Sequence, residues 1–498
     1  MQPEPSPMEP PPIADAAAPR SRAASLASLA GAAALFVLVA AALQWNTGSP
    51  LDGDTAYHVA VGRLIARHGI LHAFPWTPFS WLAEHYADKE LAFHLALAAV
   101  AGLPWATAAR AVGTIWCAGL LLALHLILRA EKVRLAWLWA LLPLVASSLF
   151  LFRVTVVRPH VASVALAAAI LWAAVRGRPL VVAALSALYP WFYVAWPLAI
   201  AMPVVAGAAR ALRRERPDWK PVAAAAVGLA IGVALHPNAA NLFGFTRIQL
   251  VDVLVRGAWG REAVRELGDE FRAATAREWA TLLAGAVGAL GAAAVLAWRA
   301  ADDMARAFAI AAACFLAATV RTIRFGEYFV PFSVLALAFA SRAIRWRWFA
   351  PVTAACLGLY SAPAALTLLS DVREARPLMA PEVEAQLAAA IPPGAQVFTC
   401  EWEHTGTLML ALPERRFMVA LDPTFFYALS PGLYEKWFAL PRQPPEHPAG
   451  VIRETFGARY VVCRWQDRSR KFFNRLALDG DVRSLLMSAD WEAYDLGP

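Results

Sequence analysis

The sequence predicts an α-helical polytopic membrane protein that ends in a small α/β domain. Of its 498 residues, 59% are hydrophobic and only 16% are charged, and the mean hydropathy is +0.50. This composition is too apolar for a soluble globular chain. Apolar segments close to the ~20 residues that cross a bilayer fill positions 26–370. From position 371 the apolar runs are short and are separated by polar residues, Pro and Gly, as in a soluble domain.

The N-terminal 25 residues are rich in Pro, Ala and Ser and hold too little apolar material to pack, so we expect a disordered tail. Residues 26–45 form the first predicted span, with Trp45 as an interfacial aromatic residue at its end. The segment is long and lacks a compact cleavage site of small residues, which disfavours a cleaved signal peptide. Arg20 and Arg22 precede it, so the positive-inside rule places the first loop, residues 46–90, outside.

Length alone gives about eleven or twelve candidate spans in residues 26–370. After the first, they are 90–103, 106–128, 135–152, 161–175, 180–191, 194–209, 222–235, 279–298, 305–320, 327–340 and 349–369. The basic connections fit the cytoplasmic side together, and they are 129–134, 176–178, 210–220, 299–306 and 342–347. The outer side then receives 153–160, 189–193, 236–278, 321–324 and everything after 369. This topology requires either that residues 90–103 are a re-entrant or partial segment or that one boundary is wrong.

The net charge of +8 is spread over these short basic loops. We interpret it as a topology signal and not as a surface for nucleic acid. The sequence therefore predicts contact with a lipid bilayer and no nucleic-acid partner.

Residues 371–498 show patterns typical of short strands and helices. Strands are expected at QVFTC (396–400), RFMVAL (416–421) and RYVVCRW (459–465), and helices at 381–390 and 431–440. Cys400 and Cys463 lie in this polar region. They can form a disulfide if the domain lies outside the cytoplasm, although their separation does not establish the geometry.

The outer loop at 46–90 is acidic in a chain that is poor in acids, and it begins with Asp52-Gly-Asp54. Two neighbouring carboxylates can bind a divalent cation such as Mg²⁺ or Mn²⁺, or one can act as a general base with a pKa raised by the other. Asp54 also suits the N-cap of an amphipathic helix, and this role does not exclude a catalytic one. His58 follows one helical turn later, where it can orient the carboxylate or bind a metal with Asp52 and Asp54.

Short motifs follow one another along the chain. The first loop holds Asp54, Tyr57-His58, Gly62, Gly69, Pro75, Phe79-Ser80 and Asp88-Lys89-Glu90-Leu91. Later motifs are Arg158-Pro159-His160, His236-Pro237-Asn238, Arg277-Glu278-Trp279, Arg324-Phe325 and Leu421-Asp422-Pro423. Their order resembles a group of bacterial membrane proteins similar to the GT-C glycosyltransferases. These include oligosaccharyltransferase catalytic subunits, protein O-mannosyltransferases and lipid A aminoarabinose transferases.

The resemblance implies an inverting glycosyltransferase of the bacterial cytoplasmic (inner) membrane that takes a sugar from a polyprenyl-phosphate carrier on the outer face. Asp54, with Asp52 beside it, would be the base that deprotonates the acceptor hydroxyl. Candidate substrate-binding residues are His58, Asp88, Glu90, Arg158, His160, Glu278, Arg321 and Arg324, of which the arginines would hold the leaving phosphate. Alternatively, the arginines snorkel at span ends, and Asp88 and Glu90 only flank the next segment.

Three departures from the group's pattern keep a second class open, and one of them is His236-Pro237-Asn238 in place of Asn-Pro-Tyr. The turn at 191–196 lacks both polar residues of the group's Trp-x-Asn-x-His element, and Glu90 is followed by Leu91 instead of Trp. The alternative hypothesis is a non-catalytic GT-C-like scaffold or assembly factor for surface glycan or lipid export. A transporter is disfavoured, because the sequence shows neither duplicated halves with broken helices nor an intramembrane charge ladder.

Two further groups of charged residues receive no catalytic role from the sequence. The mixed charges at 256–272 predict a solvated helix face rather than an acceptor-binding lid. In the C-terminal region, Glu401, Glu403, His404 and Asp422 match no triad or zinc spacing.

Overall fold

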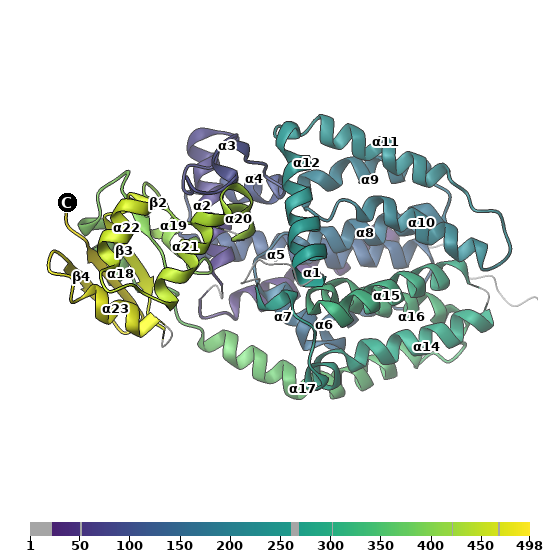
Figure 1. Ribbon diagram of the computed structural model, residues 1–498. Coiled ribbons are helices and arrows are strands. Elements are labelled where there is room, and N and C mark those ends of the chain that lie inside the picture. The colour runs from purple at the N-terminus through teal and green to yellow at the C-terminus, as the bar shows by residue number, and fades with distance from the viewer. Residues whose placement is uncertain (1–21, 50–51, 260–267, 301, 421, 467–468) are drawn as a thin grey trace, which may run out of the picture.

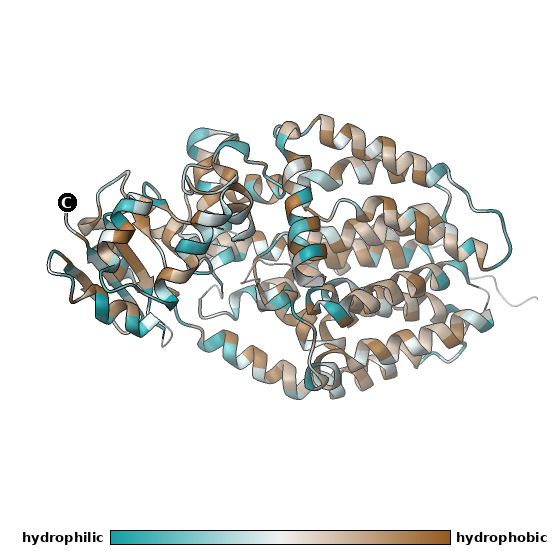
Figure 2. Cartoon of the chain, in the orientation of Figure 1, coloured by the Kyte–Doolittle hydropathy of each residue, from teal (hydrophilic) through white to brown (hydrophobic). Residues whose placement is uncertain are grey.

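The structure, a computed structural model, describes residues 22–49, 52–259, 268–300, 302–420, 422–466 and 469–498. A helical body carries a smaller α/β domain at one end (Figure 1). Figure 2 shows apolar residues along the helices of the body and more hydrophilic residues interspersed in the α/β domain. The predicted disordered tail, residues 1–25, lies almost wholly outside the described residues.

The body is a polytopic membrane domain, as its composition predicts. Six helices of the described chain are long and apolar enough to cross a membrane. They are α1 (Arg22–Trp45), α5 (Trp105–Ala130), α13 (Ala276–Glu278) running through η3 (Trp279–Leu283) into α14 (Ala284–Ala300), α15 (Asp303–Arg321), α16 (Gly326–Ala340) with its flanking turns η4 (Ile323–Phe325) and η5 (Ser341–Ala343), and α17 (Phe349–Glu374). Three shorter apolar helices lie beside them: α8 (His160–Val175), α9 (Pro179–Phe192) and α10 (Leu198–Ala211).

Two predicted segments are bent pairs of helices. The segment at 135–152 divides into α6 (Ala136–Ala146) and α7 (Ser148–Thr155), which meet at 97° where Ser147 caps α7. Helix α11 (Lys220–Ala234) turns by 117° into α12 (Ala239–Arg247) and the π-helical stretch η1 (Ile248–Trp259). The prediction of a loop at 236–278 is therefore wrong for its first half. Pro237 cannot continue the helix, so the chain breaks there and starts a new one.

Helix α16 forms the centre of the body, because every one of its residues is buried. A helix that is apolar on all sides suits either the core of a protein or the lipid of a membrane, and α16 occupies the core. In α1 and α17, by contrast, only 11% of the most apolar stretch of each helix is buried. Both helices therefore lie at the periphery of the body. Helices α9 and α11 approach closely through Gly228 and Gly232, where an added Cβ would lie 2.1 Å from a backbone oxygen of α9. Small residues at a spacing of four allow this contact in membrane helices.

The outer loop folds into α2 (Gly53–His68), α3 (Leu82–His85) and α4 (Leu91–Ala99). The amphipathic helix is confirmed, but its cap is not Asp54. Asp52 is the N-cap, and its side chain accepts a hydrogen bond from the backbone N–H of Thr55 at 2.8 Å. Helix α2 is held between α4 and α19 (Thr405–Ala411) of the α/β domain, because Gly62 lies against Leu97 and Gly406 lies against the backbone of Gly53.

The α/β domain contains a five-stranded sheet in the order β2-β1-β3-β5-β4. Its strands are β1 (Gln396–Phe398), β2 (Arg416–Phe417), β3 (Tyr460–Arg464), β4 (Arg483–Met487) and β5 (Trp491–Asp495). β1 pairs in parallel with β2 and β3, whereas β5 is antiparallel to β3 and β4. The helices are α18 (Pro381–Ala390), α19, α20 (Thr424–Leu429), α21 (Pro431–Arg442), α22 (Pro448–Phe456) and α23 (Arg470–Leu476). Cys400 and Cys463 form a disulfide, with their Cα atoms 5.4 Å apart.

The basic connections meet at the end of the body opposite the α/β domain. Arg129, Arg134 and Arg347 line one shallow cleft there. Ion pairs link other residues of these connections to one another. They join Glu131 with Arg176 and Arg342, Asp303 with Arg213, and Asp302 with Arg342. The loops that the positive-inside rule assigns to one face thus lie together in the fold.

Candidate active site

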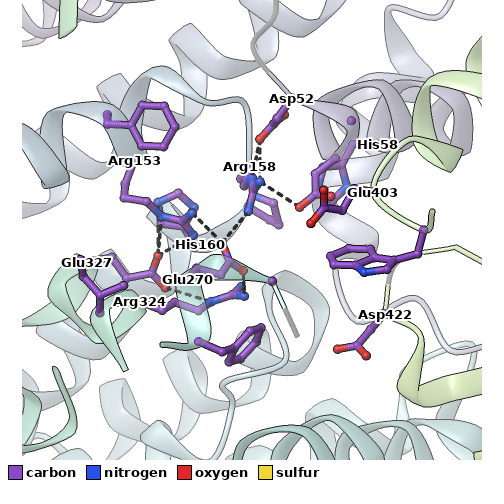
Figure 3. A pocket seen from close by; sticks show the side chains of 18 of the residues that line it. Asp52, His58, Arg153, Arg158, His160, Glu270, Arg324, Glu327, Glu403 and Asp422 are labelled. Carbon is purple, nitrogen blue, oxygen red and sulfur yellow. Dashed lines mark hydrogen bonds and ion pairs between the residues drawn. The ribbon is translucent and has the colours of Figure 1, made fainter. Parts of the chain in front are cut away.

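A cavity of about 520 Å³ lies between the helical body and the α/β domain (Figure 3). Its walls come from the start of α2, the connection between α7 and α8, the segment at 268–272, the turn η4 and the loop that leads into α19. All the segments of the body that the sequence assigns to the outer side contribute to it. The cavity therefore brings together residues that are up to several hundred positions apart in the chain.

Arg158 connects the two aspartates of the outer loop. It lies in the break between α7 and α8, immediately before Pro159, which prevents the two helices from joining. Its Nε and Nη2 atoms donate to Asp52 Oδ2 at 2.8 and 2.6 Å, and Nη2 lies 3.0 Å from Asp54 Oδ2. One guanidinium group thus holds both carboxylates at the cavity wall.

The two aspartates have opposite pKa shifts. Burial raises the pKa of Asp52, but the charge of Arg158 and hydrogen bonds from Thr55 outweigh this effect and lower it overall. Burial also raises the pKa of Asp54, where Arg158 opposes the shift and the negative charges of Asp52 and Glu270 add to it, so that the pKa lies above its ordinary value. The Asp54 side chain is 41% exposed to the cavity, against 19% for Asp52. Asp54 is therefore the accessible and more basic carboxylate of the pair.

Glu270 lies at the centre of three arginines. Its carboxylate accepts from Arg153 Nη1 at 3.1 Å and from Arg158 Nη1 at 3.2 Å, and it forms a close ion pair with Arg324. Burial raises the pKa of Glu270, but the charges of these three arginines lower it well below the usual value. The prediction of a solvated helix face is wrong for this residue, because its partners come from distant parts of the chain.

A second buried carboxylate completes the network on the side of the body. Glu327 Oε2 accepts from Arg153 at 2.9 and 3.1 Å and lies 3.8 Å from Nε2 of His160, at the start of α8. Within the described residues, neither ring nitrogen of His160 has a hydrogen-bond partner. Arg324 donates to the hydroxyl of Tyr193 at 2.7 Å. The turn at 191–196, which lacks the expected polar residues, thus still supplies a hydroxyl group to the cavity.

The predicted metal ligands Asp52, Asp54 and His58 do not form one site. Arg158 lies between the carboxylates, in the place that a cation bridging them would need. The other oxygen of Asp52 accepts from the backbone N–H and the hydroxyl of Thr55. A guanidinium group therefore supplies the positive charge here, and the donor set does not fit a divalent ion.

His58 instead joins Asp88, Glu90 and a fourth residue, His94. Its Nδ1 lies 2.8 Å from His94 Nε2 and 3.7 Å from Glu90 Oε2, while His94 Nδ1 lies 2.8 Å from both oxygens of Asp88. Burial, together with the neighbouring positive groups, lowers the pKa of His58 well below its ordinary value. His94 was missed because it follows Glu90 inside a short apolar run, where a histidine resembles a core residue.

Of the remaining predicted substrate contacts, three line the cavity and one does not. Arg324 and His160 line the cavity, and so does Glu278. However, Glu278 accepts hydrogen bonds from Arg272 and from the backbone N–H of Thr275, so its carboxylate is already occupied. Arg321 ends α15 as an exposed residue and is not part of the cavity wall, so its prediction as a substrate contact is not supported.

The α/β domain contributes one wall that the residue patterns did not identify. Trp402, Glu403, His404 and Asp422 line the cavity. Burial raises the pKa of Asp422, although hydrogen bonds from Thr424 oppose the shift. The signal that could have indicated Asp422 was its motif in the family resemblance, since no local spacing marks it.

The fold matches solved GT-C glycosyltransferases. Against the apo oligosaccharyltransferase of Archaeoglobus fulgidus the TM-score is 0.58 at 14% identity, over 88% of this chain and 69% of that one. Oligosaccharyltransferase AglB from Archaeoglobus fulgidus in complex with an inhibitory peptide and a dolichol-phosphate gives 0.59 at 14% identity, over 91% of this chain and 71% of that one. Arabinofuranosyltransferase AftD from Mycobacteria gives 0.55 at 18% identity, over 95% of this chain but only 40% of AftD.

No family model and no curated protein matches the sequence. The similarity therefore lies in the three-dimensional structure. It confirms the GT-C-like fold that the order of motifs predicts.

Proposed function

We propose that this protein is a membrane glycosyltransferase that transfers a sugar from a polyprenyl-phosphate-linked donor to an acceptor hydroxyl, with Asp54 as general base. The observation that carries the proposal is the pairing of an accessible carboxylate of raised pKa with a cluster of arginines in one cavity. A base and an oxyanion-binding group in one site are what displacement at an anomeric carbon requires. The solved complex of AglB with dolichol-phosphate supports the donor class.

The chemistry is a single displacement. Asp54 takes the proton of the acceptor hydroxyl, the oxygen forms a bond to the anomeric carbon, and the bond from that carbon to the phosphate oxygen breaks. The attacking and leaving groups lie on opposite faces of the sugar, so the configuration inverts. The leaving phosphate carries the electron pair and needs cations.

Arg153, Arg158 and Arg324 provide these cations, and they already bind one oxyanion. The Glu270 carboxylate occupies the point where their donors converge. Donor binding in this proposal exchanges the carboxylate for a phosphate group. In the intact donor the phosphate is a diester with one negative charge, like the carboxylate. The leaving polyprenyl phosphate is a monoester with more acceptor oxygens and a higher charge, so the arginines favour the exchange most as the bond to the sugar breaks.

The reaction is proposed to occur on the outer face of a bacterial inner membrane. The basic loops lie at the end of the body opposite the cavity, which favours a cytoplasmic location for that end. The Cys400–Cys463 disulfide supports an oxidising compartment for the α/β domain.

The test is sugar transfer in liposomes that contain the purified protein and a polyprenyl-phosphate-linked sugar. We expect Asp54→Asn to reduce turnover by ~10²- to 10⁴-fold, the usual contribution of a general base. Asp481→Asn, an exposed aspartate of the α/β domain, is the matched control and should keep full activity. Undiminished transfer by Asp54→Asn would show that another group is the base. A wild type that neither binds nor consumes any such donor would favour the scaffold hypothesis.

A further inference from the structure

At one wall of the cavity, two histidines and two acids form a compact cluster. His58 comes from α2, whereas Glu90 and His94 lie four residues apart at the start of α4, so their side chains share one helix face. One ligand atom from each of these three residues lies within 4.8 Å of the others. All three residues are buried, with exposed fractions between 1% and 4%. Such a concentration of donor atoms in a dry environment needs an explanation.

Asp88 fixes the orientation of the His94 ring. Both Asp88 oxygens lie 2.8 Å from His94 Nδ1, so this nitrogen is the one that carries a proton and donates. Nε2 of His94 then presents its lone pair to His58 and Glu90. Asp88 is itself held by the backbone N–H of Glu90 and by Asn238. A carboxylate that orients a histidine from behind is the usual support of a metal-ligating imidazole.

The two carboxylate oxygens of Glu90 face different neighbours. Oε1 lies 3.6 Å from the ammonium group of Lys89, which also donates to Gln249 at 2.9 Å. Oε2 faces Nδ1 of His58 at 3.7 Å. The lysine therefore neutralises one side of the carboxylate and leaves the other side directed at the two imidazoles.

We propose that His58, Glu90 and His94 bind a Zn²⁺ ion, with the fourth coordination position open to the cavity. Two imidazole nitrogens and one carboxylate oxygen are a donor set that zinc accepts, and they suit it better than Mg²⁺ or Mn²⁺. In a tetrahedral site with bonds of ~2.0–2.1 Å the two nitrogens lie ~3.3 Å apart, so they need to separate by about half an ångström from the 2.8 Å observed. His58 and Glu90 both line the cavity, so the remaining position faces it.

Zinc binding does not depend on the proposed glycosyltransferase function, because the donor atoms alone define the site. The alternative occupant is a proton shared between the two imidazoles. The two occupants differ in a measurable way, since only zinc adds a metal atom to the chain.

The experiment is metal analysis of the full chain, purified without a histidine tag and equilibrated with micromolar Zn²⁺. We expect about one zinc per chain after dialysis, as for a site with three protein ligands. His94→Ala and Glu90→Gln should retain less than about a tenth of this amount, and Asp88→Asn should bind zinc ~10- to 100-fold more weakly. His85→Ala, in α3 of the same outer loop, is the control and should bind as the wild type does.

Thermal unfolding with and without zinc separates loss of binding from loss of folding. Zinc should raise the midpoint of the wild type and of His85→Ala but not that of Glu90→Gln, which keeps the shape of the side chain. If His94→Ala does not fold, the comparison of the wild type with Glu90→Gln decides. The inference fails if the folded wild type holds no stoichiometric zinc, or if Glu90→Gln holds as much as the wild type.

Discussion

Asp52 and Asp54 differ in chemistry although only one residue separates them. Asp52 gives one oxygen to the helix cap and the other to Arg158. Asp54 has no role in the cap and reaches the cavity. Arg158 stabilises the ionised form of Asp52 strongly, and the resulting negative charge makes Asp54 harder to ionise. The pair thus consists of one carboxylate that positions the site and one that can exchange a proton.

This difference predicts the pH dependence of sugar transfer. Asp54 acts as a base only when ionised, so kcat/KM falls as the pH decreases through its pKa, and the raised pKa places this acidic limb above the ordinary value of 3.8. In Asp52→Asn, which can still accept the cap hydrogen bond, loss of the neighbouring charge should move the limb to lower pH. The measurement is kcat/KM against pH for both proteins. A limb that stays in place or moves to higher pH contradicts the coupling.

Because Glu270 binds the three arginines, we predict that its carboxylate competes with the donor phosphate for them. In Glu270→Gln the three arginines lose a charged partner, so the chain should unfold at a lower temperature and bind polyprenyl phosphate more tightly. We expect roughly a tenfold gain in affinity, as for a free-energy change of about 1.4 kcal/mol. Binding of polyprenyl phosphate in nanodiscs provides the measurement. Glu446→Gln, an exposed glutamate of the α/β domain, should change neither quantity, and weaker binding by Glu270→Gln would instead make this carboxylate part of the donor site.

At the scale of elements, helix α2 joins the two parts of the molecule. Its first residue contacts α19 so closely that a Cβ on Gly406 would lie 2.1 Å from the Gly53 carbonyl oxygen. Its middle contacts α4 through Gly62. Asp54 and His58 lie between these two contacts, so the helix holds the proposed base and the proposed zinc ligand in fixed positions relative to the α/β domain.

The sequence predicted features that depend on neighbouring residues in the chain, and it missed features that depend on contacts between distant residues. β1, β2 and β3 and the helix α18 were predicted at their observed places, because local alternation and turn residues define them. β4 and β5 were missed, since β4 is largely exposed and shows little alternation. Glu270 binds residues 54 to 117 positions away, and no local pattern reports such ion pairs. The expectation that Asp54, Arg158 and Arg324 share one site was based on the order of motifs along the chain and not on any single spacing.

At the scale of the whole molecule, charge and redox chemistry distinguish the two ends, and our proposal places these ends on opposite sides of the membrane. The basic connections gather at one end, and the disulfide and the cavity lie towards the other. A buried network of arginines and carboxylates is costly to form within hydrocarbon. Here the network lies in a cavity between the helical body and the α/β domain.

This arrangement predicts which cysteines an impermeant thiol reagent labels in intact cells. We expect Leu478→Cys, at a position 84% exposed in the α/β domain, to react from outside, and Arg216→Cys, in the basic loop after α10, to react only after permeabilisation. Cys400 and Cys463 should stay unlabelled until a reductant is added, because they are bonded to each other. Cys314→Ser and Cys356→Ser in both variants remove the exposed native thiols. Labelling of Arg216→Cys in intact cells would reverse the orientation and place the cavity on the cytoplasmic side.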